Sequence, residues 1–193
     1  MRYRPEHKQE AHARMVAAAG RGFRRRGFGG IGVDGLAKEA EVTSGAFYGH
    51  FPSKEAAFRE AVVLVMAQLR DGVLASRAAH GPDWVEAFVD FYVGERRTCE
   101  AGESCALQSL SPEVARADAS TRESFAEGLS EVVDVVAEGL DGGSLADRKR
   151  RAWGLLSVLS GGVTLARAVT DEATSKKIAK SIKEAALALA RSG

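Results

Sequence analysis

The segment from Val33 to Lys54 combines residue types that suit contact with a nucleic acid better than catalysis. Its apolar residues recur at helical spacing and predict a small core between two short helices, formed by Val33, Leu36, Ala37, Ala40, Val42 and Phe47. The second short helix would expose small, hydroxyl and ring side chains, namely Thr43, Ser44, Ala46, Tyr48 and His50. Small side chains let a helix backbone approach DNA closely, so the segment predicts a helix-turn-helix.

The two cysteines, Cys99 and Cys105, are the other side chains with reactive chemistry. They flank Glu100 and Glu103, ahead of a helix expected over residues 104–110. A thiol near a helix N-terminus gains thiolate character, which neighbouring acids oppose. Two interpretations stay open, a quiet buried thiol and an oxidant-sensing thiol. A metal site of Cys99, Glu103 and Cys105 is disfavoured because no histidine is near them in sequence.

Motifs of enzymes are missing from the sequence. It has no Ser/His/Asp order with supporting motifs, no phosphate loop and no metal-binding helix pattern. Three of the four histidines precede residue 51, so a catalytic site farther along would depend on carboxylates or thiols alone. We therefore expect no catalytic residues, no metal and no cofactor.

Charge is distributed unevenly along the 193 residues. Residues 1–54 carry ten Lys or Arg against five Asp or Glu, whereas the remainder carries 17 against 21. A basic head beside a mildly acidic body suits binding of a polyanion. No apolar run approaches the roughly 20 residues of a membrane span, and the polar N-terminus has no signal-peptide core. We expect a cytoplasmic protein that does not contact the membrane.

Hydrophobic periodicity predicts an all-α fold of about nine helices. The first helix is expected over residues 6–26 with Gly27 as its end, and a long helix is expected to begin after Ser53, a good N-cap. The other expected helices cover residues 33–40, 44–50, 84–92, 104–110, 121–140, 145–169 and 171–190. Each of the four prolines is expected where a helix starts.

One run of the sequence is specific enough to indicate a family. Ser44-Gly45 is followed by Phe47-Tyr48-Gly49-His50-Phe51-Pro52-Ser53-Lys54-Glu55, which closely resembles the recognition-helix junction of the TetR/AcrR family of bacterial transcriptional regulators. The resemblance implies a three-helix DNA-binding domain over residues 1–52. It also implies a helical effector-binding and dimerisation domain over residues 53–193.

The resemblance also implies roles for individual residues. Thr43, Tyr48 and Lys54 would contact phosphates of a double-stranded operator, while Ser44, Gly45, Ala46 and His50 are candidates for contact in the groove. Glu41 departs from the family pattern, which usually has glycine at this turn position. A positive φ is expected there, at a cost of about 1 kcal/mol.

The C-terminal part carries no comparably specific motif. Its last two expected helices resemble the family's dimerisation pair, so we expect a homodimer on a pseudo-palindromic operator. We expect a repressor that is released by a small apolar effector, with the candidate ligand-binding residues Leu69, Phe88, Tyr92, Cys105, Phe125 and Trp153. The alternative is a regulator that senses oxidants or electrophiles through Cys105 or Cys99.

Overall fold

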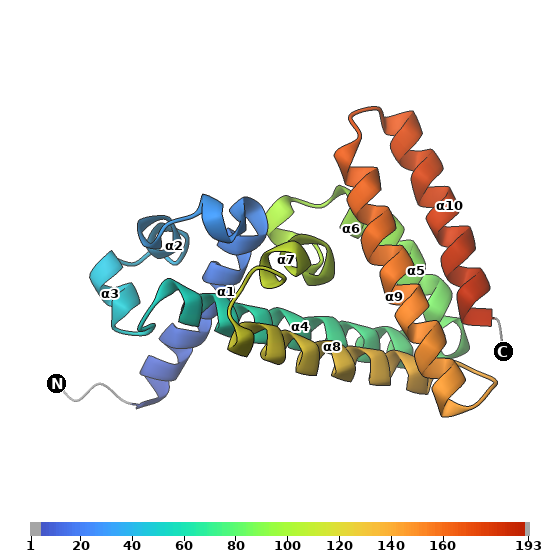
Figure 1. Ribbon diagram of the computed structural model, residues 1–193, viewed down its shortest axis with the longest axis horizontal. Coiled ribbons are helices and arrows are strands. Elements are labelled where there is room, and N and C mark those ends of the chain that lie inside the picture. The colour runs from blue at the N-terminus through green and yellow to red at the C-terminus, as the bar shows by residue number, and fades with distance from the viewer. Residues whose placement is uncertain (1–4, 192–193) are drawn as a thin grey trace. The chain divides into compact units, whose positions relative to one another are not determined.

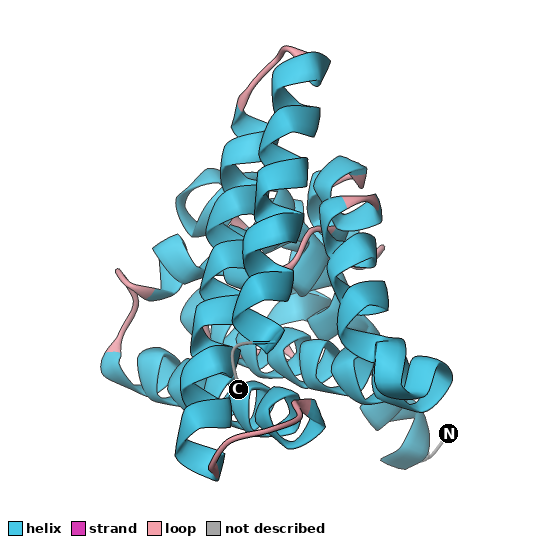
Figure 2. Ribbon diagram, turned by 90° about the vertical axis from the view of Figure 1, so that its right-hand side faces the viewer, coloured by secondary structure: helices cyan, strands magenta, loops and turns pink. Residues whose placement is uncertain are grey.

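The computed structural model describes residues 5–191, with side chains from Lys8 onward. Throughout this part of the chain the regular elements are helices, and none is a strand (Figure 2). The all-α fold expected from the periodicity is therefore confirmed.

The helices follow one another with short connections (Figure 1). Two of the segments, η1 and η2, are single 3₁₀ turns. In chain order the segments are α1 (Pro5–Gly30), α2 (Val33–Glu39), α3 (Ser44–Tyr48), α4 (Lys54–His80), η1 (Gly81–Asp83), α5 (Trp84–Val93), α6 (Glu95–Thr98), η2 (Ala101–Glu103), α7 (Ala106–Val114), α8 (Ala119–Gly139), α9 (Leu145–Ala168) and α10 (Glu172–Arg191).

Local residue types set several of these boundaries. Gly27 leaves the helical conformation at φ 71° and ψ 166°, which kinks α1 where a helix end was expected. The Ser53 hydroxyl accepts a hydrogen bond from the Ala56 amide at 3.1 Å and caps α4. The expectation for the prolines was wrong at Pro112, which lies inside α7. Pro112 has no amide hydrogen to donate to the Gln108 carbonyl four residues earlier, so α7 lacks one helical hydrogen bond there.

The chain divides into two compact units. The first extends to Met66 and also includes Ala101–Ala126, while the second comprises Ala67–Glu100 and the chain from Glu127 onward. The later segment joins the first unit because η2 and α7 pack against α1. There the Arg24 guanidinium donates to the Gly102 carbonyl at 2.6 Å. The functional boundary expected between residues 52 and 53 stays a prediction.

Aromatic rings form the core of the first unit. Phe23 and Phe58 pack edge to face, with ring centroids 5.0 Å apart. Phe47 and Phe51 are fully buried, with centroids 4.9 Å apart. Such pairs bury large apolar areas in preferred geometries, so they fix α3 and the start of α4 against α1.

Helix packing and one buried arginine organise the second unit. Leu155, Leu159 and Ile182 are buried where α9 and α10 pack together. Arg151 is only 1% exposed, and its guanidinium donates to the carbonyls of Asp141, Gly142 and Ala190 at 2.6 to 2.8 Å. This side chain therefore ties the α8–α9 loop to the end of α10.

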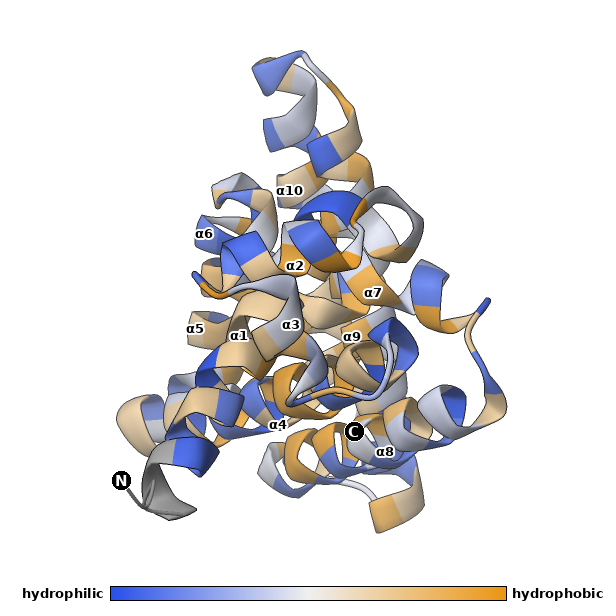
Figure 3. Cartoon of the chain, turned by 90° about the vertical axis from the view of Figure 1, so that its left-hand side faces the viewer, coloured by the Kyte–Doolittle hydropathy of each residue, from blue (hydrophilic) through white to orange (hydrophobic). Residues whose placement is uncertain are grey.

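The helices alternate hydrophilic and hydrophobic segments, clearly so along α4 and α8 in Figure 3. This pattern is that of helices with one buried and one solvated face. Among the described residues no helix has the length and apolar content needed to cross a membrane.

Candidate DNA-binding site

A tight turn joins α2 to α3. The Val42 amide donates to the Ala37 carbonyl at 2.9 Å, and the Glu41 amide donates to the Lys38 carbonyl at 3.1 Å. These bonds close the end of α2 and require Glu41 to adopt φ 57°. The positive φ expected at this position is thus confirmed, and Glu41 holds it without the freedom of a glycine.

Helix α3 buries one residue and presents the others. Phe47 is fully buried, while Thr43, Gly45, Ala46 and Tyr48 are exposed. Thr43 is the N-cap, and its hydroxyl accepts from the Ala46 amide at 3.1 Å. The resulting surface is small and polar, with free backbone near Gly45, as close approach to a groove requires.

Ser44 and Lys54 both interact inside the protein. The Ser44 hydroxyl donates to the Asp34 carboxylate at 2.5 Å, linking α3 to α2. The Lys54 ammonium lies 4.3 Å from the centroid of the Phe28 ring, at the first turn of α4. Tyr48, in contrast, is 57% exposed and its ring meets only the edge of Phe47. Of the three, Tyr48 is the most accessible to a macromolecule.

His50 belongs to a chain of titratable side chains. Its Nδ1 lies 3.3 Å from Nδ1 of His12 on α1, and the planes of the two rings are inclined by 26°. Nε2 of His12 lies 2.6 Å from the Glu60 carboxylate on α4. Partial burial lowers the pKa of His50, and electrostatic repulsion from His12, when that ring is protonated, and from Lys8 lowers it further.

Sequence reasoning identified His50 but missed its partners. His12 and Glu60 are far from it in sequence, and nothing in their local pattern marks them. Only the docking of α1 and α4 beside the end of α3 brings them together. Two of the arginines near the end of α1 interact within the protein, because Arg24 binds Gly102 and Arg25 pairs with Glu39 at 2.5 Å.

The residues expected to bind an effector are divided between the two units. Cys105 and Phe125 belong to the first unit, whereas the other four belong to the second, namely Leu69, Phe88, Tyr92 and Trp153. Phe88 and Tyr92 are buried on α5 with ring centroids 5.7 Å apart. Trp153 is 44% exposed on α9.

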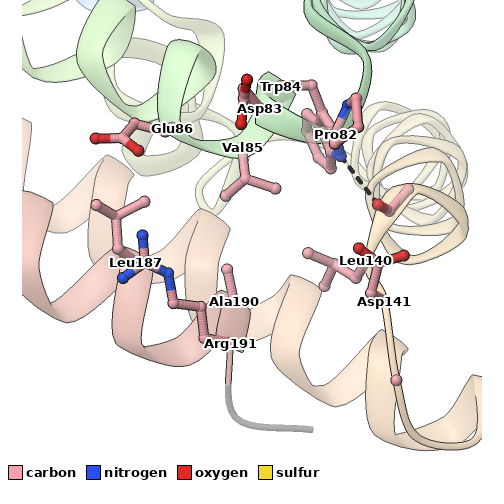
Figure 4. A pocket seen from close by; sticks show the side chains of 12 residues that line it. Pro82, Asp83, Trp84, Val85, Glu86, Leu140, Asp141, Leu187, Ala190 and Arg191 are labelled. Atoms are coloured by element: carbon pink, nitrogen blue, oxygen red, sulfur yellow. Dashed lines mark hydrogen bonds between the residues drawn. The ribbon is translucent and has the colours of Figure 1, made fainter.

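The second unit contains a cavity of about 430 Å³ that includes none of these residues. Figure 4 shows it between the start of α5, the end of α8 and the last turn of α10. Trp84 forms one wall and donates from its indole nitrogen to the Gly139 carbonyl at 2.9 Å. Charged side chains at its edge, Asp83, Glu86, Asp141 and Arg191, make this cavity unlike the apolar site expected for the effector.

The two cysteines have different environments. Cys105 is buried and forms the N-cap of α7. Cys99 is half-buried at the end of α6, and its Sγ lies 3.7 Å from the Arg167 guanidinium. That guanidinium also donates to the carbonyls of Arg96, Arg97 and Cys99 at 3.0 to 3.1 Å, so it stays beside the thiol. Among the described residues, no group of three potential ligands is arranged to hold a metal.

Comparison with family models gives one match, which covers the candidate site. Residues 15–61 match the model of bacterial regulatory proteins of the tetR family. This range runs from the middle of α1 into α4 and contains the whole of α2, the turn and α3. No curated protein matches the chain in sequence.

Several solved structures share the fold along most of the chain. Escherichia coli NemR in its reduced form is 20% identical, with a TM-score of 0.74 over 91% of this chain and 97% of that one. A TetR-family regulator from Agrobacterium tumefaciens is 15% identical, with a TM-score of 0.73 over 91% and 97%. Bacillus subtilis FadR in complex with stearoyl-CoA is 14% identical, with a TM-score of 0.64 over 93% and 97%. Residues 15–61 therefore match the tetR family at the helix-turn-helix, and the chain as a whole shares the fold of these solved structures.

Proposed function

We propose that the protein represses transcription as a homodimer, by binding a pseudo-palindromic operator through α3 and leaving it when a small apolar effector binds. The observation that carries the proposal is the exposed surface of α3 within the segment matched by the tetR model. That surface combines a capped helix start, the small residues Gly45 and Ala46, and the exposed ring of Tyr48.

Each exposed residue has a distinct proposed part in DNA binding. Thr43 and Tyr48 provide hydroxyl groups for phosphates, and Lys54 adds a cation at the start of α4. Gly45 and Ala46 let the backbone of α3 approach the base edges, where specificity arises. Ser44 retains lone pairs for a base or water, because its hydrogen is donated to Asp34.

Selection of bound fragments from the bacterial genome tests the proposal. Purified protein should enrich a small set of fragments, and footprinting should reveal two protected half-sites about 34 Å apart. Tyr48→Ala should lower affinity for an enriched fragment at least about tenfold. Leu74→Ala is the matched control, since Leu74 is an exposed apolar residue of α4 outside the tetR match and should leave affinity unchanged.

The surface of α9 supports the homodimer. Trp153 and Leu165 are 44% and 63% exposed, and Gly161 between them has open space around the position of a Cβ. Large apolar side chains flanking a small residue suit close packing of helices across a two-fold axis. Leu155, Leu159 and Val163 of α9 are buried within the protomer, whereas this stripe is available to a second copy.

The proposed effector is small and apolar. Support comes from the buried aromatic pair Phe88 and Tyr92 on α5, and from the similarity in fold to FadR, which was solved with stearoyl-CoA. The free fatty acid stearate, which has the same apolar chain without the charged coenzyme A, is therefore a first probe of the effector class. Its addition should release the protein from an enriched fragment and raise the melting temperature. If probes of this class change neither quantity, the proposal of an apolar effector fails.

A second candidate function is oxidant sensing, favoured by the position of Cys99. The Arg167 guanidinium lies 3.7 Å from the half-buried sulfur of Cys99, and a cation beside a cysteine is a feature of reactive thiols. Cys105 is more deeply buried, so Cys99 is the better candidate of the two. The fold similarity to NemR in its reduced form is compatible with such a role.

Single cysteine variants distinguish the two functions. If the protein senses oxidants, mild peroxide should release wild-type protein from DNA, and Cys99→Ser or Cys105→Ser should abolish the release. Mass spectrometry would then identify the oxidised residue. An identical response of wild type and both variants would exclude the thiols as sensors.

A further inference from the structure

We propose that His12 and Glu60 are positioning residues for His50, and that the histidine pair takes up a proton on DNA binding, making His50 Nε2 a hydrogen-bond donor to a backbone phosphate. This inference rests on the proposed DNA-binding function. It concerns a cluster formed by three elements, α1, α4 and the residue that follows the C-cap of α3.

The hydrogen-bond partners fix the direction of the chain. An ionised carboxylate only accepts, so Nε2 of His12 carries a hydrogen toward Glu60. In a neutral His12 the other nitrogen, Nδ1, is then an acceptor. It faces Nδ1 of His50 at 3.3 Å, so that nitrogen must carry the hydrogen between the two rings. The two neutral histidines therefore have opposite tautomers.

This order leaves Nε2 of neutral His50 as a bare acceptor. No hydrogen bond to this nitrogen occurs among the described residues, and His50 is only half-buried. A phosphate oxygen is also an acceptor, so neutral His50 cannot bind it through Nε2. At high pH the end of α3 thus presents a lone pair where a donor is needed.

One added proton converts Nε2 of His50 from an acceptor to a donor, whichever of the two rings holds the charge. If His50 is protonated, both its nitrogens carry hydrogens. If His12 is protonated instead, its Nδ1 donates to Nδ1 of His50, whose own hydrogen then resides on Nε2. The proton belongs to the pair, and in both arrangements Nε2 of His50 is a donor.

Charges around the pair oppose protonation until DNA binds. Lys8 and His12 face His50 from α1, and Glu60 acts on it from α4 only through His12. Desolvation lowers the pKa of His50 in the free protein, and repulsion between a second proton on His50 and a charged His12 or Lys8 lowers it further. A phosphate beside Nε2 adds the opposite charge and raises it. DNA binding is therefore coupled to proton uptake, and affinity should increase as the pH falls.

The test begins with the wild-type protein alone. At about pH 8, ¹⁵N imidazole shifts should report the Nε2–H tautomer for His12 and the Nδ1–H tautomer for His50. This measurement needs neither DNA nor a variant. The same tautomer at both residues would overturn the inference while leaving the proposed function intact.

The second arm measures affinity against pH with a mixed-sequence fluorescent duplex of about 30 base pairs at fixed salt, since phosphate contacts are independent of sequence. Between about pH 8 and pH 6 the affinity of wild type should rise by up to about tenfold per pH unit for each His50 that gains a proton. His50→Phe should lack this rise. His80→Phe, which changes an exposed histidine at the other end of α4, should reproduce the wild-type profile.

His12→Phe tests the positioning role itself, because it retains a ring against His50 and Phe51 without the two nitrogens. It frees His50 to place a hydrogen on Nε2 and removes a neighbouring charge. The variant should bind more tightly than wild type at about pH 8 and lose less affinity between pH 6 and 8. Equal weakening at both values, or a flat wild-type profile, would overturn the inference. Absence of any DNA binding would overturn the proposed function with it.

Discussion

Replacing Glu41 with glycine should stabilise the protein, although it removes a side chain and adds no contact. Glu41 is the only described residue other than glycine with a positive φ, at 57°, and its side chain is exposed with no ion pair or hydrogen bond among the described contacts. The left-handed conformation costs an ordinary residue about 1–2 kcal/mol. Glycine adopts it freely but adds about 0.4–1 kcal/mol of chain entropy to the unfolded state.

The balance of these two effects is an increase of about 0.5–1 kcal/mol in the free energy of unfolding. For a chain of this length, each kcal/mol corresponds to a rise of about 2–4 °C in melting temperature. Urea unfolding at fixed protein concentration measures the change directly. Because the turn positions α3, the substitution should leave affinity for DNA unchanged or slightly higher.

Lys38→Gly is the matched control, since Lys38 is an exposed residue of α2 three positions earlier. There the same change introduces glycine into a helix, and it should lower the free energy of unfolding by about 1 kcal/mol. The two substitutions should thus have opposite signs. If Glu41→Gly destabilises the protein as Lys38→Gly does, the attribution of strain to Glu41 is wrong.

Three further predictions concern the rest of the molecule. Arg151→Met should lower the free energy of unfolding by about 1–3 kcal/mol, because it leaves the buried Ala190 carbonyl without a donor and unties the α8–α9 loop, and urea unfolding that shows no decrease would contradict this. Leu165→Glu should convert the dimer to monomer in light scattering without loss of helical circular dichroism, whereas an unchanged mass would place the interface elsewhere. Folding lowers the pKa of His50 below 6.5, so the folded protein is favoured by the neutral ring above that pH. This contribution to the free energy of unfolding is lost as the pH falls toward the folded pKa. His50→Phe should therefore make the free energy of unfolding, measured in urea, less sensitive to acid.

Local signals in the sequence predicted much of the fold. Ser53 caps α4, Gly27 breaks α1, and Glu41 adopts a positive φ, each for reasons confined to a few neighbouring residues. The tetR-like junction, Phe47–Glu55, likewise consists of neighbouring residues. Its resemblance to the family could therefore be recognised from the sequence alone.

Features that depend on distant residues could not be predicted in this way. Packing of η2 and α7 on α1 follows from contacts such as Arg24 to Gly102, separated by 78 residues. Pro112 lies inside α7 and not at its start, although proline residues favour the first turn of a helix. The exposure of Trp153, the burial of Arg151 and the pairing of His12 with His50 all depend on which faces meet, and helical periodicity does not specify that.

The central claim, that α3 binds a specific operator, is tested most directly by fluorescence anisotropy with an enriched genomic fragment at physiological salt. The account predicts a dissociation constant of about 10⁻⁸ M or tighter, weakened at least about tenfold by Tyr48→Ala and unchanged by Leu74→Ala. The claim would be contradicted if no fragment bound more tightly than the non-specific background of about 10⁻⁴–10⁻⁶ M. Equal affinities of wild type and Tyr48→Ala would contradict the assignment of α3 as the reading helix.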